Sequence, residues 1–117
     1  MSYVDGFLLP VPKKNLKSYR KMAAVGKKLW MKYGALAYME CVGDDLNPKY
    51  GLPFPKVVKP KPGETVVFSF IVYKSKAHRN QVNAKVMKDP SMKSMPTEMP
   101  FDMQRMCFGG FKAIVEA

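Results

Sequence analysis

The segment that decides the fold runs from Thr65 to Tyr73 and reads TVVFSFIVY. Successive positions of a strand point to opposite faces, and both sets of positions are apolar here. One set is Val66, Phe68, Phe70 and Val72, and the other includes Val67, Ile71 and Tyr73. A sheet that is wetted on one side alternates apolar and polar residues, so this segment predicts a sheet that is covered on both faces.

Three other runs have the same two-sided apolar character: Tyr3–Pro10, Ala35–Gly43 and Arg105–Val115. The two segments with helical character can cover one face of a sheet built from these four strands. The chain has little left for the other face. We therefore expect a second copy of the protein to cover it, so the sequence predicts a homodimer.

The two helices are predicted from periodicity and end signals. The first runs from about Lys14 to Tyr33, and a rotation of about 100° per residue separates an apolar side from a basic side. The basic side contains Lys13, Lys14, Lys17, Arg20, Lys21, Lys27, Lys28 and Lys32. The second helix begins after Ser75, a good N-cap. It ends before Pro90, because the residue before a proline leaves the helical region.

The resulting order is strand, helix, strand, strand, helix, strand. With antiparallel pairing it predicts a single α+β domain over residues 1–117, a ferredoxin-like βαββαβ sandwich with strand order four, one, three, two. Both helices then cover the same face. In this order Cys41 and Cys107 fall on opposite edge strands, too far apart for a disulfide, so both are expected to be free thiols.

Two segments are irregular. A proline-rich arm at about residues 44–63 holds five of the ten prolines, and within it Lys56–Lys59 is predicted to form a short extra strand. Residues 91–103 follow the second helix, in a region where six methionines lie from Met87 to Met106. Methionine side chains pack adaptably, so this segment is expected to lie over the core.

Polar residues inside the apolar elements mark a candidate site. They are Asp5, Glu40, Ser69 and Tyr73 on strands, and Arg79 and Asn83 on the inner side of the second helix. Buried carboxylates must be paired or have a raised pKa, so the structural interpretation is an ionic or hydrogen-bonded network. The functional interpretation is a small polar pocket in which a carboxylate acts as a general base. The structural interpretation ranks first, and the sequence assigns no catalytic residue.

Arg79 lies on the valine side of its helix, so its guanidinium is expected to be partly buried and to bond a carboxylate. The candidate partners are Asp5, Glu40, Asp89 and Asp102. His78 is the single histidine, and it is expected to be exposed. No paired Cys/His spacing occurs, so the sequence predicts neither a metal site nor a cofactor.

The formal net charge of +11 suits an acidic partner without demonstrating one. Phe68, Ser69, Phe70, Ile71 and Tyr73 match the spacing of an RNA-recognition strand, but the basic residue and the glycine of that motif are replaced by valines. A buried strand is the favoured interpretation, and nucleic-acid binding ranks behind it. No apolar stretch approaches the ~20 residues of a membrane helix, and no secretory signal opens the chain. These absences predict a cytoplasmic protein without a membrane partner.

Separated motifs along the chain carry a resemblance to a known family. They are YVDGF at Tyr3–Phe7, Glu40-Cys41, ETVVFS at Glu64–Ser69, YKS at Tyr73–Ser75, MPFD at Met99–Asp102, and Gly109-Gly110-Phe111. The chain resembles the YbaA-like bacterial family of unknown function almost from end to end. The resemblance implies a dimeric α/β barrel, in which two ferredoxin-like subunits pack sheet against sheet, and it implies no established activity or substrate.

The leading hypothesis is therefore a dimeric protein that binds or converts a small molecule in a polar pocket near the strand carboxylates. Whether it is an enzyme stays open. The alternatives are a basic nucleic-acid-associated protein and a structural dimer without a ligand. Exposure of Phe68 and Phe70 in the assembly favours the nucleic-acid alternative, whereas a cavity lined by Asp5, Glu40 or Arg79 favours the small molecule.

Overall fold

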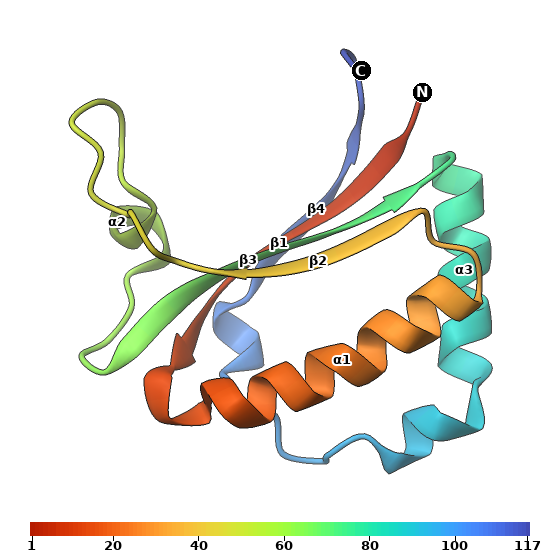
Figure 1. The fold of residues 1–117 in the computed structure, drawn as a ribbon, viewed down its shortest axis with the longest axis horizontal. Helices are drawn as coiled ribbons and strands as arrows, with labels where there is room; N and C mark the ends of the chain where they lie inside the picture. The colour runs from red at the N-terminus through yellow and green to blue at the C-terminus, as the bar shows by residue number, and fades with distance from the viewer.

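The computed structural model describes all residues from 1 to 117 (Figure 1). The elements are β1 (Tyr3–Pro12), α1 (Leu16–Lys32), β2 (Ala37–Val42), α2 (Phe54–Val58), β3 (Glu64–Tyr73), α3 (Lys76–Lys88) and β4 (Cys107–Lys112). Single 3₁₀ turns occupy Lys13–Asn15, Pro90–Ser94 and Met103–Arg105. No helix is long and apolar enough to cross a membrane.

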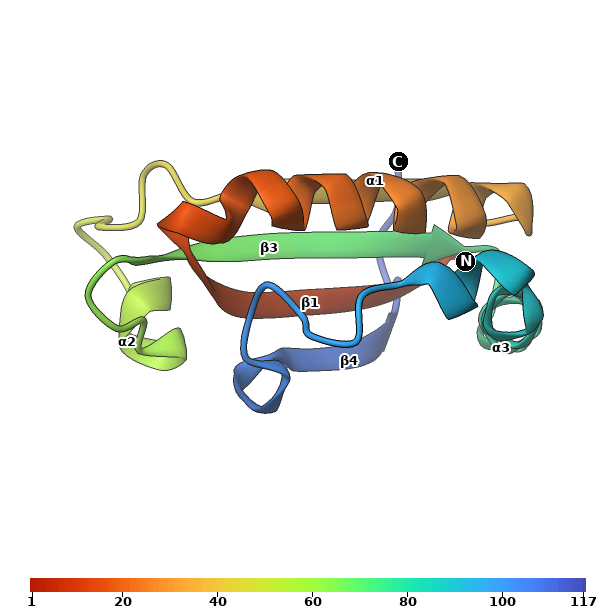
Figure 2. The same ribbon diagram turned by 90° about the horizontal axis from the view of Figure 1, so that it is seen from below.

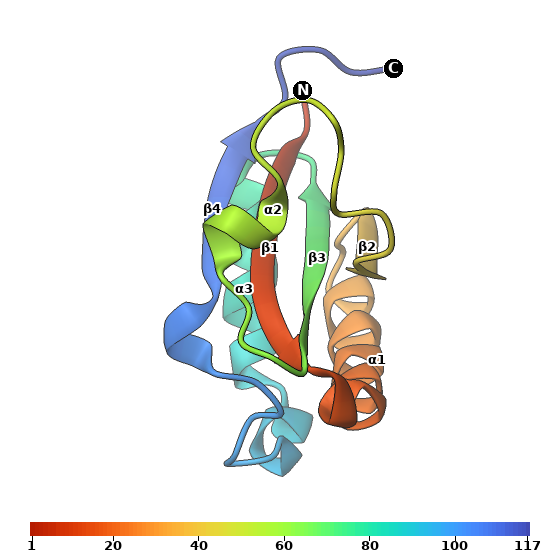
Figure 3. The same cartoon turned by 90° about the vertical axis from the view of Figure 1, so that its left-hand side faces the viewer.

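The four strands form one antiparallel sheet with the order β2-β3-β1-β4, which is the order predicted from the sequence. Figure 3 shows the strands side by side in this order. Both long helices lie on the same side of the sheet (Figure 1), and residues 90–105 run from the end of α3 alongside α1 to the start of β4 (Figure 2). The fold is thus α+β, and the predicted free thiols Cys41 and Cys107 lie on opposite edge strands.

The helix-covered face holds the core. From the sheet it buries Leu9, Val11, Val67, Ile71 and Tyr73, and from the helices Tyr19, Ala23, Leu29, Val82 and Val86. The apolar side of α1 faces the sheet as its periodicity predicts. Ser75 caps α3 by accepting the N–H of His78 at 3.0 Å, which confirms the predicted start of that helix.

The opposite face of the sheet, which we call the open face, is apolar and largely uncovered. Its side chains include Val4, Leu8, Ala37, Met39, Cys41, Phe68, Phe70, Val72 and Phe111. Phe68 is 46% exposed, Met39 52% and Phe111 63%. Contiguous apolar surfaces of this kind mark interaction sites in soluble proteins.

The predicted strand at Lys56–Lys59 is wrong, because this part of the arm forms the helix α2. Pro55 suits the first turn of a helix, where its missing N–H is not needed. Lys59, at φ 54°, ends the helix in the left-handed region. Val58 of α2 is buried, as are Pro10 and Val66 on the open face, so the arm covers one end of that face.

The last strand is also shorter than predicted. Residues Met103–Arg105 form a 3₁₀ turn, since the carboxylate of Asp102 accepts the N–H of Gln104 at 3.0 Å, and β4 begins only at Cys107. The bidentate ion pair between Arg105 and Glu64, at 2.8 Å, fixes this turn to the start of β3.

The methionine-rich segment is held at its start by Asp89, one of the few buried acidic residues. The Asp89 carboxylate accepts bonds from Tyr33 Oη at 2.6 Å, from Lys32 Nζ at 3.1 Å and from the N–H and hydroxyl of Ser91. Hydrogen bonds from the Ser91 hydroxyl and then from Tyr33 hold the pKa of Asp89 well below its usual value. The segment therefore begins at a fixed point beside α1.

We expect Asp89→Asn to lower the melting temperature at neutral pH and to weaken its dependence on acid. The folded pKa of Asp89 lies below the unfolded value of about 4, so the stabilisation is complete above that pH and is lost as the pH falls through the folded value. Thermal melts across an acid series measure the effect. Asp45→Asn, at an exposed aspartate of the arm, is the control and should behave like wild type. Equal acid sensitivity of both variants contradicts the proposed role of Asp89.

Candidate functional site

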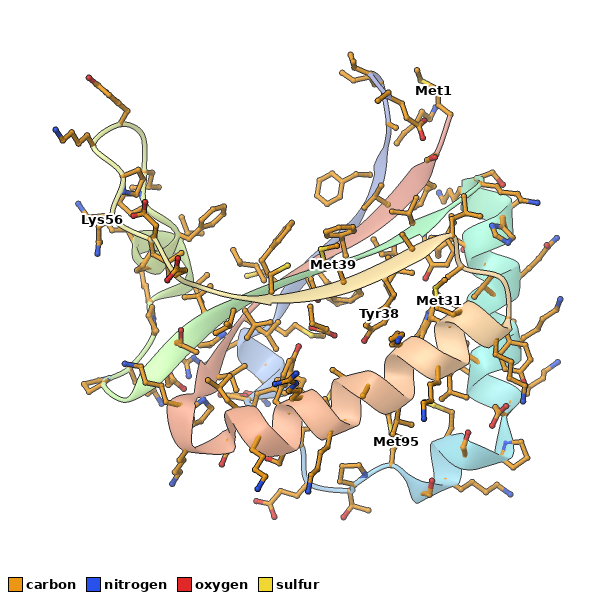
Figure 4. All side chains as sticks on the ribbon, viewed as in Figure 1. Met1, Met31, Tyr38, Met39, Lys56 and Met95 are labelled. Carbon is orange, nitrogen blue, oxygen red and sulfur yellow. The ribbon has the colours of Figure 1, made fainter.

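Glu40 is the centre of the candidate site. It lies on β2, directly opposite the buried Ser69 of β3, and its side chain points to α1. One carboxylate oxygen accepts a bond from Tyr19 Oη of α1 at 2.7 Å, and the other accepts one from Tyr38 Oη at 2.7 Å. Figure 4 shows Tyr38 between the sheet and α1. Two phenols thus fix both oxygens of one carboxylate.

Gly26 of α1 makes room for this arrangement. A Cβ atom at this position would lie 3.1 Å from Tyr38 Oη, closer than nearly all such contacts. Since Gly26 is buried, the helix cannot easily move away to relieve the contact. A glycine inside a helix lowers helix stability. The close approach of the Tyr38 hydroxyl explains why this position nevertheless suits glycine.

Both phenols remain protonated donors at physiological pH. Burial is the main cause that raises the pKa of Tyr19 well above its ordinary value. The hydrogen bond to Glu40 and the negative charge of Glu40 raise it further. Burial and the charge of Glu40 raise the pKa of Tyr38 in the same way. Each ionised carboxylate oxygen can accept more than one bond, so Glu40 can still accept a bond from a ligand.

Two hollows meet at this carboxylate. The inner cavity, of about 240 Å³, lies between the sheet, α1 and the methionine-rich segment. Its lining is mainly apolar and comprises Phe7, Leu9, Tyr19, Met22, Ala23, Gly26, Trp30, Tyr38, Glu40, Ser69, Ile71, Met92, Met95, Met99, Phe101 and Met106. The outer groove, of about 660 Å³, lies between α1 and the edge strand β2. Tyr19, Ala23, Tyr38 and Glu40 border both.

A second polar cluster lies beside the inner cavity, under α3. Arg79 Nη1 lies 3.3 Å from Asp5 Oδ1, and the guanidinium stacks over the ring of Tyr3 at 5.0 Å. Burial raises the pKa of Asp5, while the charge of Arg79 opposes that rise. Neither Asp5 Oδ1 nor Arg79 Nε has a well-aligned hydrogen-bond partner, so the contact is ionic. The predicted burial of Arg79 beside a carboxylate is confirmed, and the partner is Asp5.

Asn83 joins this second cluster to the cavity wall. Its Oδ1 accepts bonds from Trp30 Nε1 at 3.0 Å and from Tyr73 Oη at 3.2 Å. The indole of Trp30 lines the inner cavity. The hydrogen bond to Asn83 therefore orients an aromatic wall of the cavity.

The six predicted site residues thus lie on one side of the sheet but in two groups. Glu40 and Ser69 line the inner cavity, whereas Asp5, Tyr73, Arg79 and Asn83 form the neighbouring network and do not line it. Sequence reasoning missed Tyr19 and Tyr38. The sequence pattern could have indicated both. Tyr38 lies two residues before Glu40 and so shares its strand face, and Tyr19 lies on the apolar side of α1.

His78 is not fully exposed, contrary to the prediction. Its Nδ1 accepts the N–H of Lys74 at 3.0 Å, and its ring packs edge-on against Tyr73 with centroids 6.1 Å apart. The hydrogen bond and the packing explain its partial burial. The structure contains no group of three or more His, Cys, Asp or Glu side chains that could hold a metal ion.

The Glu40 site predicts an unusual alkaline titration. Tyr19 and Tyr38 should ionise well above the ordinary pKa of about 10. In Glu40→Gln their pKa values should fall but stay raised, because burial, the larger cause, remains. Phenolate absorbance measures the titration, with circular dichroism monitoring the fold. Glu98→Gln, at an exposed position, is the matched control. Burial also raises the pKa of Tyr73, so the arrangement is wrong if Glu40→Gln and Glu98→Gln titrate alike.

Comparisons with known proteins place the chain in a family. Residues 2–103 match the model described as "Protein of unknown function (DUF1428)". The chain is 43% identical over 116 residues to "Uncharacterized protein YbaA" of Escherichia coli (strain K12) and to that of Shigella flexneri, with 99% of each chain covered. A solved structure, "De novo designed protein Foldit4", aligns with a TM-score of 0.48 and 9% identity over 97% of this chain and 99% of that one. The extent of the sequence matches shows that the chain belongs to the DUF1428 family of proteins of unknown function.

Proposed function

We propose that the protein binds a small, largely apolar molecule in the inner cavity, and that a hydrogen-bond donor of this ligand bonds Glu40. The observation that carries the proposal is the Glu40 carboxylate, held by two phenols in a wall that is otherwise mainly apolar. Binding sites combine apolar walls with a few placed polar groups in this way.

The size and lining of the cavity define the ligand. A volume of about 240 Å³ is below the usual range for drug-sized ligands, so the part of the ligand inside this cavity is about one ring in size. The aromatic side chains of Phe7, Trp30 and Phe101 suit a flat apolar body, and the methionines can adapt to its outline. A carboxylate demands a donor such as a hydroxyl, an amine or a ring N–H.

The same arrangement can support proton transfer without a cofactor. Glu40 can accept a proton from a bound molecule as a general base. The phenols of Tyr19 and Tyr38 each have one O–H, which bonds Glu40 and holds its carboxylate in place for this step. The proposed function is therefore either binding alone or binding followed by chemical conversion of the ligand. Both require the ligand to bind at Glu40.

We also propose that the protein is a homodimer in which the two open faces cover each other. The strand order and the placement of both helices on one side fit a ferredoxin-like subunit, and a second copy on the open face gives a dimeric α/β barrel. The exposed Phe68, Met39 and Phe111 support this cover, since water contact with such a surface is costly. A stable interface needs at least about 1,000 Å² of total buried area, which an open sheet face can supply.

Nucleic-acid binding is the weaker alternative. The exposed Phe68 on the open face is what a base-stacking platform requires. The basic side of α1, however, faces away from the sheet on the helix-covered side of the molecule. A strand of nucleic acid stacked on the open face therefore cannot reach these cations. A structural dimer without a ligand leaves the Glu40 arrangement unexplained.

We expect Met39→Lys to dissociate the dimer, because it places a charge on the open face. Met31→Lys is the matched control, since Met31 is also a half-exposed methionine but lies on α1 (Figure 4). Light scattering at micromolar concentration should give a dimer for wild type and for Met31→Lys, and a monomer for Met39→Lys. A monomeric wild type contradicts the proposed dimer.

Phenol and anisole test the ligand site, because they share a ring but only phenol can donate a hydrogen bond. A bond to a charged group favours the donor, so we expect phenol to bind at least about ten-fold more tightly. Glu40→Leu should abolish this preference, and Glu98→Leu should retain it. Calorimetry measures the affinities, and the indole N–H resonance of Trp30, the single tryptophan, reports occupancy of the cavity. Equal binding of the two probes by wild type overturns the proposed function.

A further inference from the structure

The outer groove differs from the inner cavity in its charges. It lies between residues 16–27 of α1 and the edge strand β2, and its apolar lining includes Leu16, Ala24, Met39, Val42 and Val67. Two cations, Arg20 and Lys27, also line it, both from α1. They are seven residues apart on one helix, which places their Cα atoms about 10 Å apart along the axis.

These two cations have no partner within the protein. The three ion pairs of the structure involve Lys32, Arg79 and Arg105, and neither Arg20 nor Lys27 takes part in them. The single carboxylate in the groove lining, Glu40, is engaged by two phenols. The groove therefore combines an apolar lining with two unpaired positive charges, which complements an organic anion.

The position of the groove ties it to the Glu40 site. Tyr19, Ala23, Tyr38 and Glu40 border both the groove and the inner cavity. Ala23 is a small residue at this boundary. Because the two hollows adjoin at these four side chains, a ligand that bonds Glu40 lies next to the groove.

We infer that the ligand is an organic acid with three parts: a hydrogen-bond donor that meets Glu40, an apolar body, and a carboxylate that lies in the outer groove near Arg20 and Lys27. This inference rests on the proposed function, since it names the chemical class of the ligand bound at Glu40. The donor and the anion are at opposite ends of the molecule. The apolar body between them contacts Ala23 and the aromatic and methionine side chains of the two linings.

The experiment compares para-hydroxyphenylacetate with para-hydroxyphenylacetamide, which share the phenol donor and the ring and differ in the charge of the other end. Calorimetry should find the acid bound about five-fold more tightly by wild type, as expected for two solvent-exposed cations. The preference should shrink as salt is added, because exposed charges are screened.

Two double variants identify the cations responsible. Arg20→Gln with Lys27→Gln should remove the preference for the acid. Lys21→Gln with Lys28→Gln makes the same change in net charge on the same helix, outside the groove lining, and should retain it. Equal preferences in the two double variants overturn the inference, because the effect is then only the general positive charge of the protein.

The outcomes separate this inference from the proposed function. If wild type prefers phenol to anisole but binds the acid no more tightly than the amide, the inference fails and the Glu40 site remains. If wild type does not distinguish phenol from anisole, the proposed function fails, and the inference fails with it. Binding of the acid with the predicted loss in the Arg20 and Lys27 variant supports both.

Discussion

A sheet with apolar side chains on both faces sets the constraint on which the rest of this structure depends. The helix-covered face meets the constraint with α1, α3 and the methionine-rich segment. The open face is covered only at one end, where α2 contacts β1 and β3 and where Val58, Pro10 and Val66 are buried. The proposed dimer is the physical solution for the remainder, since burial of apolar area is the main favourable term in association.

The candidate site follows from how α1 covers the sheet. Two small residues of α1, Ala23 and Gly26, line the inner cavity, so the helix adds little bulk at these two positions near Glu40. Tyr38 enters that space from the sheet and Tyr19 enters it from the helix. A carboxylate there would be costly without donors, and the two phenols supply them while leaving the cavity open. The way in which α1 packs on the sheet therefore also forms the candidate site.

The two polar clusters have different physical roles. The Asp5–Arg79 contact joins β1 to α3 and is largely shielded from water, with side-chain exposures of 8% and 22%. It lines neither the inner cavity nor the outer groove, so the structural interpretation fits it. Glu40 borders both hollows and retains capacity to accept a bond. Of the two carboxylates in the candidate site, only Glu40 therefore supports the functional interpretation.

The sequence by itself determined the elements with a clear period or end signal: the two-sided strands, the basic amphipathic α1, and α3 with its Ser75 cap. The element order also predicted the strand order, because a βαββαβ chain with antiparallel pairing forms a sheet of this order. Only the tertiary structure decided that the arm forms α2, that Asp5 pairs with Arg79, and that Tyr19 and Tyr38 hold Glu40. Such contacts join residues far apart in the chain, and local pattern carries no information on which of several carboxylates or phenols the packing brings within bonding distance.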